Sequence, residues 1–141
     1  MLQGLSPLLS PDLPHLLTSM GHGEEIVLAH TNFPVATHTR RLVRLPGVTS
    51  PQMQEAVLSV LPLDDFVQHA AFTMHVMGNA AAVPETAQDF TSVLQRAGHA
   101  AAAPMERFAF YERGTAAFAV VAAGETRIYG NSLLEKSVVR P

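Results

Sequence analysis

The segment 21–34 holds several side chains that could bind and act on a small polar molecule. His22 stands between two glycines, which remove bulk on both sides and let a ligand approach the imidazole closely. Residues 26–29 are apolar, as in a buried strand, and His30, Thr31 and Asn32 follow at once. Because α/β proteins bind ligands at the carboxyl ends of such strands, we interpret the segment as half of a small-molecule site. A solvated histidine in a tight helix-to-strand turn fits the pattern equally well.

The spacing of the histidines and acids does not predict a metal site. His22, His30 and His38 are spaced eight residues apart, a spacing that matches neither helix nor hairpin ligand patterns, and the chain has no cysteine. Asp64 and Asp65 could share a metal, but neighbouring side chains point apart in most local structures. We therefore favour a loop or helix-capping role for this acidic pair.

Composition excludes several classes of protein. The net charge of −3 argues against a nucleic-acid partner, and the longest apolar run, 116–123, is far shorter than the roughly 20 residues that cross a bilayer. No phosphate-binding glycine motif and no Gly-x-Ser-x-Gly sequence is present, so neither nucleotide binding nor serine hydrolysis is supported. Only 15% of the residues are charged, against about 25% in an ordinary domain, which predicts self-association. A cytoplasmic location is expected, because the first residues lack a basic signal region.

The elements that would position these residues alternate between helix and strand. Apolar spacing predicts helices over 11–20, 50–61, 84–98 and 108–116, and strands over 25–29, 40–45, 66–76, 118–122 and 133–139, with a strand or loop ending near 105–107 and a loop over 34–39. Ser10 and Ser50, each followed by proline, are the expected helix caps. The apolar strands would be covered on both faces, so we predict one three-layer α/β/α domain over residues 1–141.

Several separated motifs occur in one order along nearly the whole chain. They are 5–11 (LSPLLSP), 20–23 (MGHG), 25–29 (EIVLA), 32–34 (NFP), 107–113 (RFAFYER), 117–121 (AFAVV), 124–125 (GE) and 129–131 (YGN). Together they resemble the fucose mutarotase and ribose pyranase family, and the Phe-Pro and Tyr-Gly-Asn forms are similar to its fucose branch. The resemblance implies a mixed sheet and an isomerase that interconverts the anomers of a free monosaccharide, chiefly L-fucose, without a cofactor. It also implies a ring-like homo-oligomer, often a decamer, with sites near subunit contacts.

The resemblance assigns roles to particular residues. His22 matches the proton donor. The residues that would hold the sugar are His30, Arg107, Tyr129, Gly130 and Asn131. His30 stands where the family has a sugar-binding aspartate, so a non-catalytic monosaccharide-binding oligomer and a purely structural ring remain alternatives. Taken singly, Tyr129 and Asn131 could also belong to an ordinary β-turn, and Arg107 to an ion pair.

Overall fold

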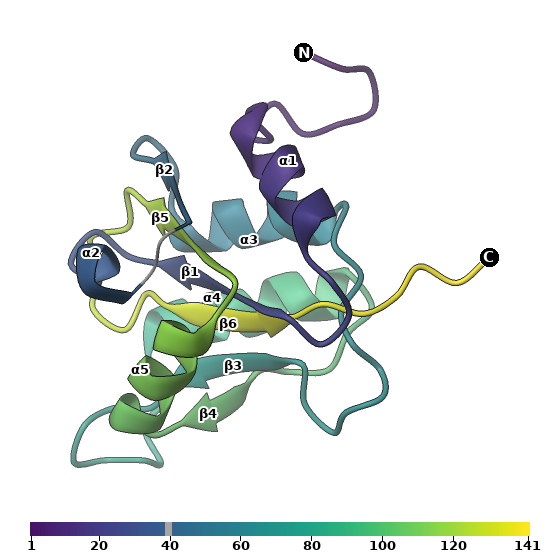
Figure 1. The fold of residues 1–141 in the computed structure, drawn as a ribbon. Helices are drawn as coiled ribbons and strands as arrows, with labels where there is room; N and C mark the ends of the chain where they lie inside the picture. The colour runs from purple at the N-terminus through teal and green to yellow at the C-terminus, as the bar shows by residue number, and fades with distance from the viewer. Residues whose placement is uncertain (39–40) are drawn as a thin grey trace.

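The computed structural model describes residues 1–38 and 41–141, which form a mixed sheet with helices on both faces (Figure 1). The strands are β1 (Glu25–Ala29), β2 (Leu42–Leu45), β3 (Ala71–Met74), β4 (Ala103–Met105), β5 (Ala119–Ala123) and β6 (Ser132–Glu135). The helices are α1 (Asp12–Ser19), α2 (Val35–His38), α3 (Ser50–Leu58), α4 (Glu85–Arg96) and α5 (Arg107–Ala116).

The strand order is β2-β5-β1-β6-β3-β4, and β6 runs against both of its neighbours, β1 and β3. The β2–β5, β5–β1 and β3–β4 pairs are parallel. The loops that follow β1, β3, β4 and β5 therefore lie at one edge of the sheet, together with the loop that precedes β6. We call this the carboxyl edge, and the opposite one, where β1 begins and β6 ends, the amino edge.

Alternation along β1 explains why the sheet needs helices on both faces. Ile26 and Leu28 are fully buried in a core with α1, α3 and α4, whereas Val27 and Ala29 are buried in a second core with α2 and α5. Successive strand residues point to opposite faces, so one continuous apolar run fills both cores. The three-layer α/β architecture predicted from the sequence is confirmed.

Both predicted N-terminal helix caps were wrong by one residue. Pro11 occupies the cap position of α1, and no side chain there accepts a hydrogen bond from the helix. In α3 the cap is Thr49, whose backbone is extended and whose side chain accepts from the Gln52 N–H in a capping box. Ser50 is already helical and buried, so it is unable to serve as the half-extended residue that a cap requires.

Several element boundaries also differ from the predictions. The strand expected over 66–76 spans only Ala71–Met74, because Asp64 accepts the Phe66 N–H and turns the chain before the sheet. The last strand ends at Glu135 rather than at 139, and α2 lies in the segment expected to be a loop. The strand predicted over 40–45 is observed from Leu42; Thr39 and Arg40 lie outside the described residues.

Within residues 1–38 and 41–141, every helix is too short or too polar to cross a membrane.

Candidate functional site

The carboxyl edge brings three of the sequence-predicted site residues into contact. The His30 N–H, directly after β1, donates to Asn131 Oδ1 at 3.0 Å, directly before β6. Gly130 lies between them and the Glu125 side chain: a Cβ there would lie 3.2 Å from His30 Cβ and 2.7 Å from Glu125 Cγ. Only glycine fits this position, so the Gly130 backbone is part of the site's construction.

Tyr129 is held in an unusual backbone conformation at the same edge. Its φ of 60° is the only positive value at a non-glycine residue among those described. The Thr86 hydroxyl, from α4, donates to the Tyr129 carbonyl at 3.0 Å, and the Met77 N–H donates to the Tyr129 hydroxyl at 3.2 Å. These bonds hold the backbone carbonyl and the phenolic oxygen of Tyr129 in place, and the phenolic proton remains free to donate elsewhere.

Arg107 reaches the carboxyl edge from β4. It opens α5 immediately after Glu106, whose carboxylate caps the helix by accepting the Ala109 N–H at 3.0 Å. Its Nε is buried and has no hydrogen-bond partner among the described residues, and its guanidinium carbon lies 4.7 Å from the Phe108 ring centroid. Because β3 separates β4 from β6, Arg107 and Asn131 start about 10 Å apart across the sheet.

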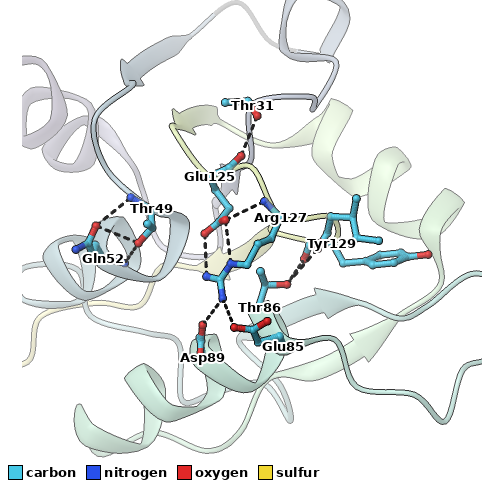
Figure 2. Close-up of polar contacts among 10 residues, drawn as sticks. Thr31, Thr49, Gln52, Glu85, Thr86, Asp89, Glu125, Arg127 and Tyr129 are labelled. Carbon is cyan, nitrogen blue, oxygen red and sulfur yellow. Dashed lines mark hydrogen bonds and ion pairs between the residues drawn. The ribbon is translucent and has the colours of Figure 1, made fainter.

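A network that sequence reasoning missed supports this edge (Figure 2). Glu125 is almost fully buried, and both of its oxygens accept from the Arg127 guanidinium at 3.0 Å. Arg127 also donates to Asp89 at 2.8 Å and Glu85 at 3.0 Å, both on α4. The Glu125 carbonyl accepts from the hydroxyl of Thr31 at 2.8 Å, next to His30. The network thus ties α4 to both loops of the site; the Gly124-Glu125 pair was its only sequence signal.

Burial favours the neutral form of the His30 imidazole, and a neighbour determines its tautomer. Burial lowers the pKa of His30, and the Glu125 carboxylate only partly opposes this effect. The Asn32 N–H donates to His30 Nδ1 at 3.1 Å, so the proton of the neutral ring is on Nε2.

The predicted proton donor, His22, lies at the amino edge instead. Its Nε2 is 3.3 Å from Asp64 Oδ2, and the histidine side chain is 43% exposed whereas that of Asp64 is 2% exposed. The Phe66 N–H is the main cause that lowers the pKa of Asp64, and His22 lowers it further. An exposed imidazole backed by a buried carboxylate can exchange protons with a bound molecule. Asp64 was predicted to have a loop or helix-capping role and lies in a loop, but its pairing with His22 was not predicted.

One chain does not bring His22 to the other predicted residues. His22 precedes β1 and His30 follows it, and the four residue steps from Glu25 to Ala29 alone span about 13 Å. Figure 1 shows these two turns at opposite ends of the sheet. The segment 21–34 therefore contributes to two separate half-sites.

Further charged groups surround Asp64 at the amino edge. Arg113, from α5, forms an ion pair with Glu25 and lies 3.9 Å from Glu135. Burial is the main cause that raises the pKa of Glu135, and a hydrogen bond with Asp64 raises it further. Sequence patterns give no sign of this cluster, because its members come from four distant segments.

The described residues contain no group of three His, Cys, Asp or Glu side chains that could hold a metal ion. His38, which belongs to the eight-residue spacing of histidines, lies in α2, but its side chain is outside the described ones.

An α/β sheet with a polar site at its carboxyl edge is the architecture of a small-molecule-binding α/β protein. The model of the RbsD / FucU transport protein family matches residues 3–139, and the chain belongs to this family. The fucose mutarotase of Bos taurus is 45% identical over 99% of this chain and 95% of its own length. The crystal structure of the fucose mutarotase from Streptococcus pneumoniae in complex with L-fucose has a TM-score of 0.91 and 35% identity, covering 99% of this chain and 100% of that one. The fold is also similar to that of Bacillus subtilis RbsD complexed with D-ribose, with a TM-score of 0.77 over 99% of this chain and all of that one, at 18% identity.

Proposed function

We propose that this protein is a sugar mutarotase, an isomerase that interconverts the anomers of a free aldose such as L-fucose. The observation that carries the proposal is the His22–Asp64 pair, in a chain that aligns along its whole length with fucose mutarotases. Mutarotation requires a proton to reach the ring oxygen while another leaves the anomeric hydroxyl. A histidine backed by a carboxylate suits this exchange near neutral pH.

The position of His22 supports a site shared between two subunits. His22 is the proton-exchanging group, whereas the groups suited to hold sugar hydroxyls, including Asn131 and Arg107, lie at the opposite edge of the sheet. We propose that His22 of one copy faces the carboxyl edge of its neighbour. Head-to-tail contact of this kind generates a ring when the rotation between copies closes, which is compatible with the ring-like decamer implied by the family resemblance.

Exposed apolar side chains beside both half-sites support the same arrangement. Phe66 is exposed, and its ring centroid lies 5.3 Å from that of His22. Met77, Phe108 and Ile128 are exposed beside the polar residues of the carboxyl edge. Large apolar side chains gathered at a surface are typical of an interface.

The cytoplasmic location of the protein remains a prediction.

Anomeric exchange measured by NMR tests the proposed activity. The wild-type protein should accelerate exchange between the α and β anomers of L-fucose, and His22→Ala should remove most of that acceleration while leaving the oligomer intact. Binding without acceleration would favour the alternative, a non-catalytic monosaccharide-binding oligomer. A protein that neither binds L-fucose nor accelerates its exchange would favour the other alternative, a structural ring.

Mixing two inactive variants tests the shared site. His22→Ala and Asn131→Ala subunits should each be inactive alone but should regain activity when they are unfolded, mixed and refolded together. Mixed oligomers contain interfaces with one intact half-site from each subunit. If the mixture stays as inactive as its components while the wild type refolds with full activity, the two half-sites are not shared. Light scattering that shows a monomer at micromolar concentration would contradict the oligomer itself.

A further inference from the structure

The polar side chains at the carboxyl edge are almost all presented to a ligand as hydrogen-bond donors. His30 has its Nδ1 occupied by the Asn32 N–H, so only Nε2–H is available. Asn131 Oδ1 already accepts the His30 N–H at 3.0 Å, and the amide nitrogen offers two further donors. The Tyr129 hydroxyl already accepts from Met77 at 3.2 Å, which leaves its proton.

Arg107 adds a permanent positive charge to this set. The guanidinium is a donor only, and it remains charged at any physiological pH. Its buried Nε has no partner among the described residues. A buried donor without a partner is costly, so a bound acceptor at this position would be favourable.

The nearby carboxylates do not provide acceptors to balance these donors. Glu106 is occupied as the cap of α5, where it accepts the Ala109 N–H at 3.0 Å. Glu125 is occupied by the Arg127 guanidinium through both oxygens (Figure 2), and it is almost fully buried, next to Gly130. Among the described residues, Glu106 and Glu125 are thus engaged by donors of the protein itself, and Glu85 and Asp89 by Arg127.

We infer that the preferred substrate of this site is an aldose that carries a carboxylate, that is, a hexuronic acid. This inference rests on the proposed mutarotase function. Each neutral sugar hydroxyl brings a proton that needs an acceptor, whereas a carboxylate brings acceptors only and matches the donors of His30, Asn131 and Tyr129. Arg107 forms planar, paired hydrogen bonds with a carboxylate, and one guanidinium balances one negative charge. A phosphate group would carry about twice that charge and would need a second cation.

The test measures catalysed anomeric exchange by NMR for matched sugars. A hexuronic acid, its parent hexose and the hexose 6-phosphate differ only at the sixth carbon, and L-fucose is the reference for the proposed function. We expect kcat/KM for the hexuronic acid to exceed that for the parent hexose by about tenfold or more, because charge-assisted hydrogen bonds are roughly twice as strong as neutral ones. Two variants localise the effect. His30→Asp, which places a negative charge and an acceptor at this edge, should reverse the preference in favour of the hexose, and Arg107→Gln should reduce it.

Each outcome separates the inference from the function on which it rests. Acceleration of L-fucose exchange with no preference for the hexuronic acid would overturn the inference and leave the mutarotase proposal intact. A preference for the 6-phosphate would also overturn the inference, because the anionic group would then be a phosphate. An unchanged preference in His30→Asp would overturn the role of His30. No acceleration of any sugar would contradict both proposals.

Discussion

The imidazole of His22 lies 3.3 Å from the carboxylate of Asp64, and only the imidazole is exposed. The carboxylate is held in place by the Phe66 N–H at 3.0 Å, so it presents a fixed negative charge to the ring. Such a partner orients the imidazole for proton exchange with a bound molecule.

Asp64→Asn should therefore reduce the catalysed anomeric exchange by about tenfold or more, part of the roughly 10²–10⁴-fold that a positioned acid or base contributes. The neighbouring Asp65→Asn is the control, because Asp65 pairs with Arg140 instead, at 2.6 Å on the surface. NMR exchange rates of the two variants give the comparison. Equal rates would mean that Asp64 does not assist His22.

Gly130→Ala should disrupt the carboxyl edge. Its Cβ would lie 2.7 Å from Glu125 Cγ and 3.1 Å from the Arg127 carbonyl, in a buried place where neither neighbour moves freely. We expect a loss of about 1–3 kcal/mol in the free energy of unfolding, the usual cost of overpacking, together with weaker sugar binding. Gly47→Ala is the matched control, because a Cβ at Gly47 would meet nothing within 4 Å. Denaturant unfolding of both variants measures the difference, and similar losses would contradict the close packing around Gly130.

Arg127→Gln should leave the buried Glu125 carboxylate without its main partner. Breaking a buried ion pair costs about 3–5 kcal/mol, and we expect about 2–3 kcal/mol here because Arg127 is one third exposed. The double variant Glu125→Gln with Arg127→Gln should recover part of that loss, since no charge is then buried alone. Arg96→Gln is the control: its pair with Glu55, at 3.6 Å, is exposed and should contribute less than about 1 kcal/mol. Equal unfolding free energies for the two single variants would refute the role of the network.

The sequence predicted those features of the fold that a local pattern of residue types determines. The apolar run of β1 and its alternation between two cores follow from residue types alone, and so does the positioning of His30 at the end of a buried strand. The α3 cap was wrong by one residue because Thr49, Ser50 and Pro51 all suit a helix start, and only the backbone distinguishes them.

Sequence reasoning predicted only part of the candidate site. His22 and His30 are close in the sequence, but a strand between them places them at opposite edges of the sheet. Glu125 and Arg127 are only two residues apart, but the ion pair between Arg127 and Asp89 joins segments that are distant in the sequence. No periodicity encodes such contacts, so they appear only when the chain is folded.

Glu135→Gln should stabilise the protein at neutral pH. Burial, with a contribution from Asp64, raises the pKa of Glu135 above its ordinary value of 4.5, so the folded state holds this proton more tightly than the unfolded chain does. The stability associated with the protonated form is present below pH 4.5 and is lost as the pH rises through the folded-state pKa. Glutamine keeps the shape of the protonated acid and carries no charge, so this loss should disappear.

Thermal unfolding across a range of pH measures the effect. The melting temperature of Glu135→Gln should exceed that of the wild type by a few degrees at pH 7, and the difference should shrink as the pH falls toward 4. Glu112→Gln is the control, because Glu112 is an exposed residue of α5 and its substitution should change the melting temperature little at any pH. Arg113 retains its ion pair with Glu25 in the variant, so this cation still has a carboxylate partner. A Glu135→Gln variant that is less stable than the wild type at pH 7 would mean that the ionised carboxylate contributes more through Arg113 than its burial costs.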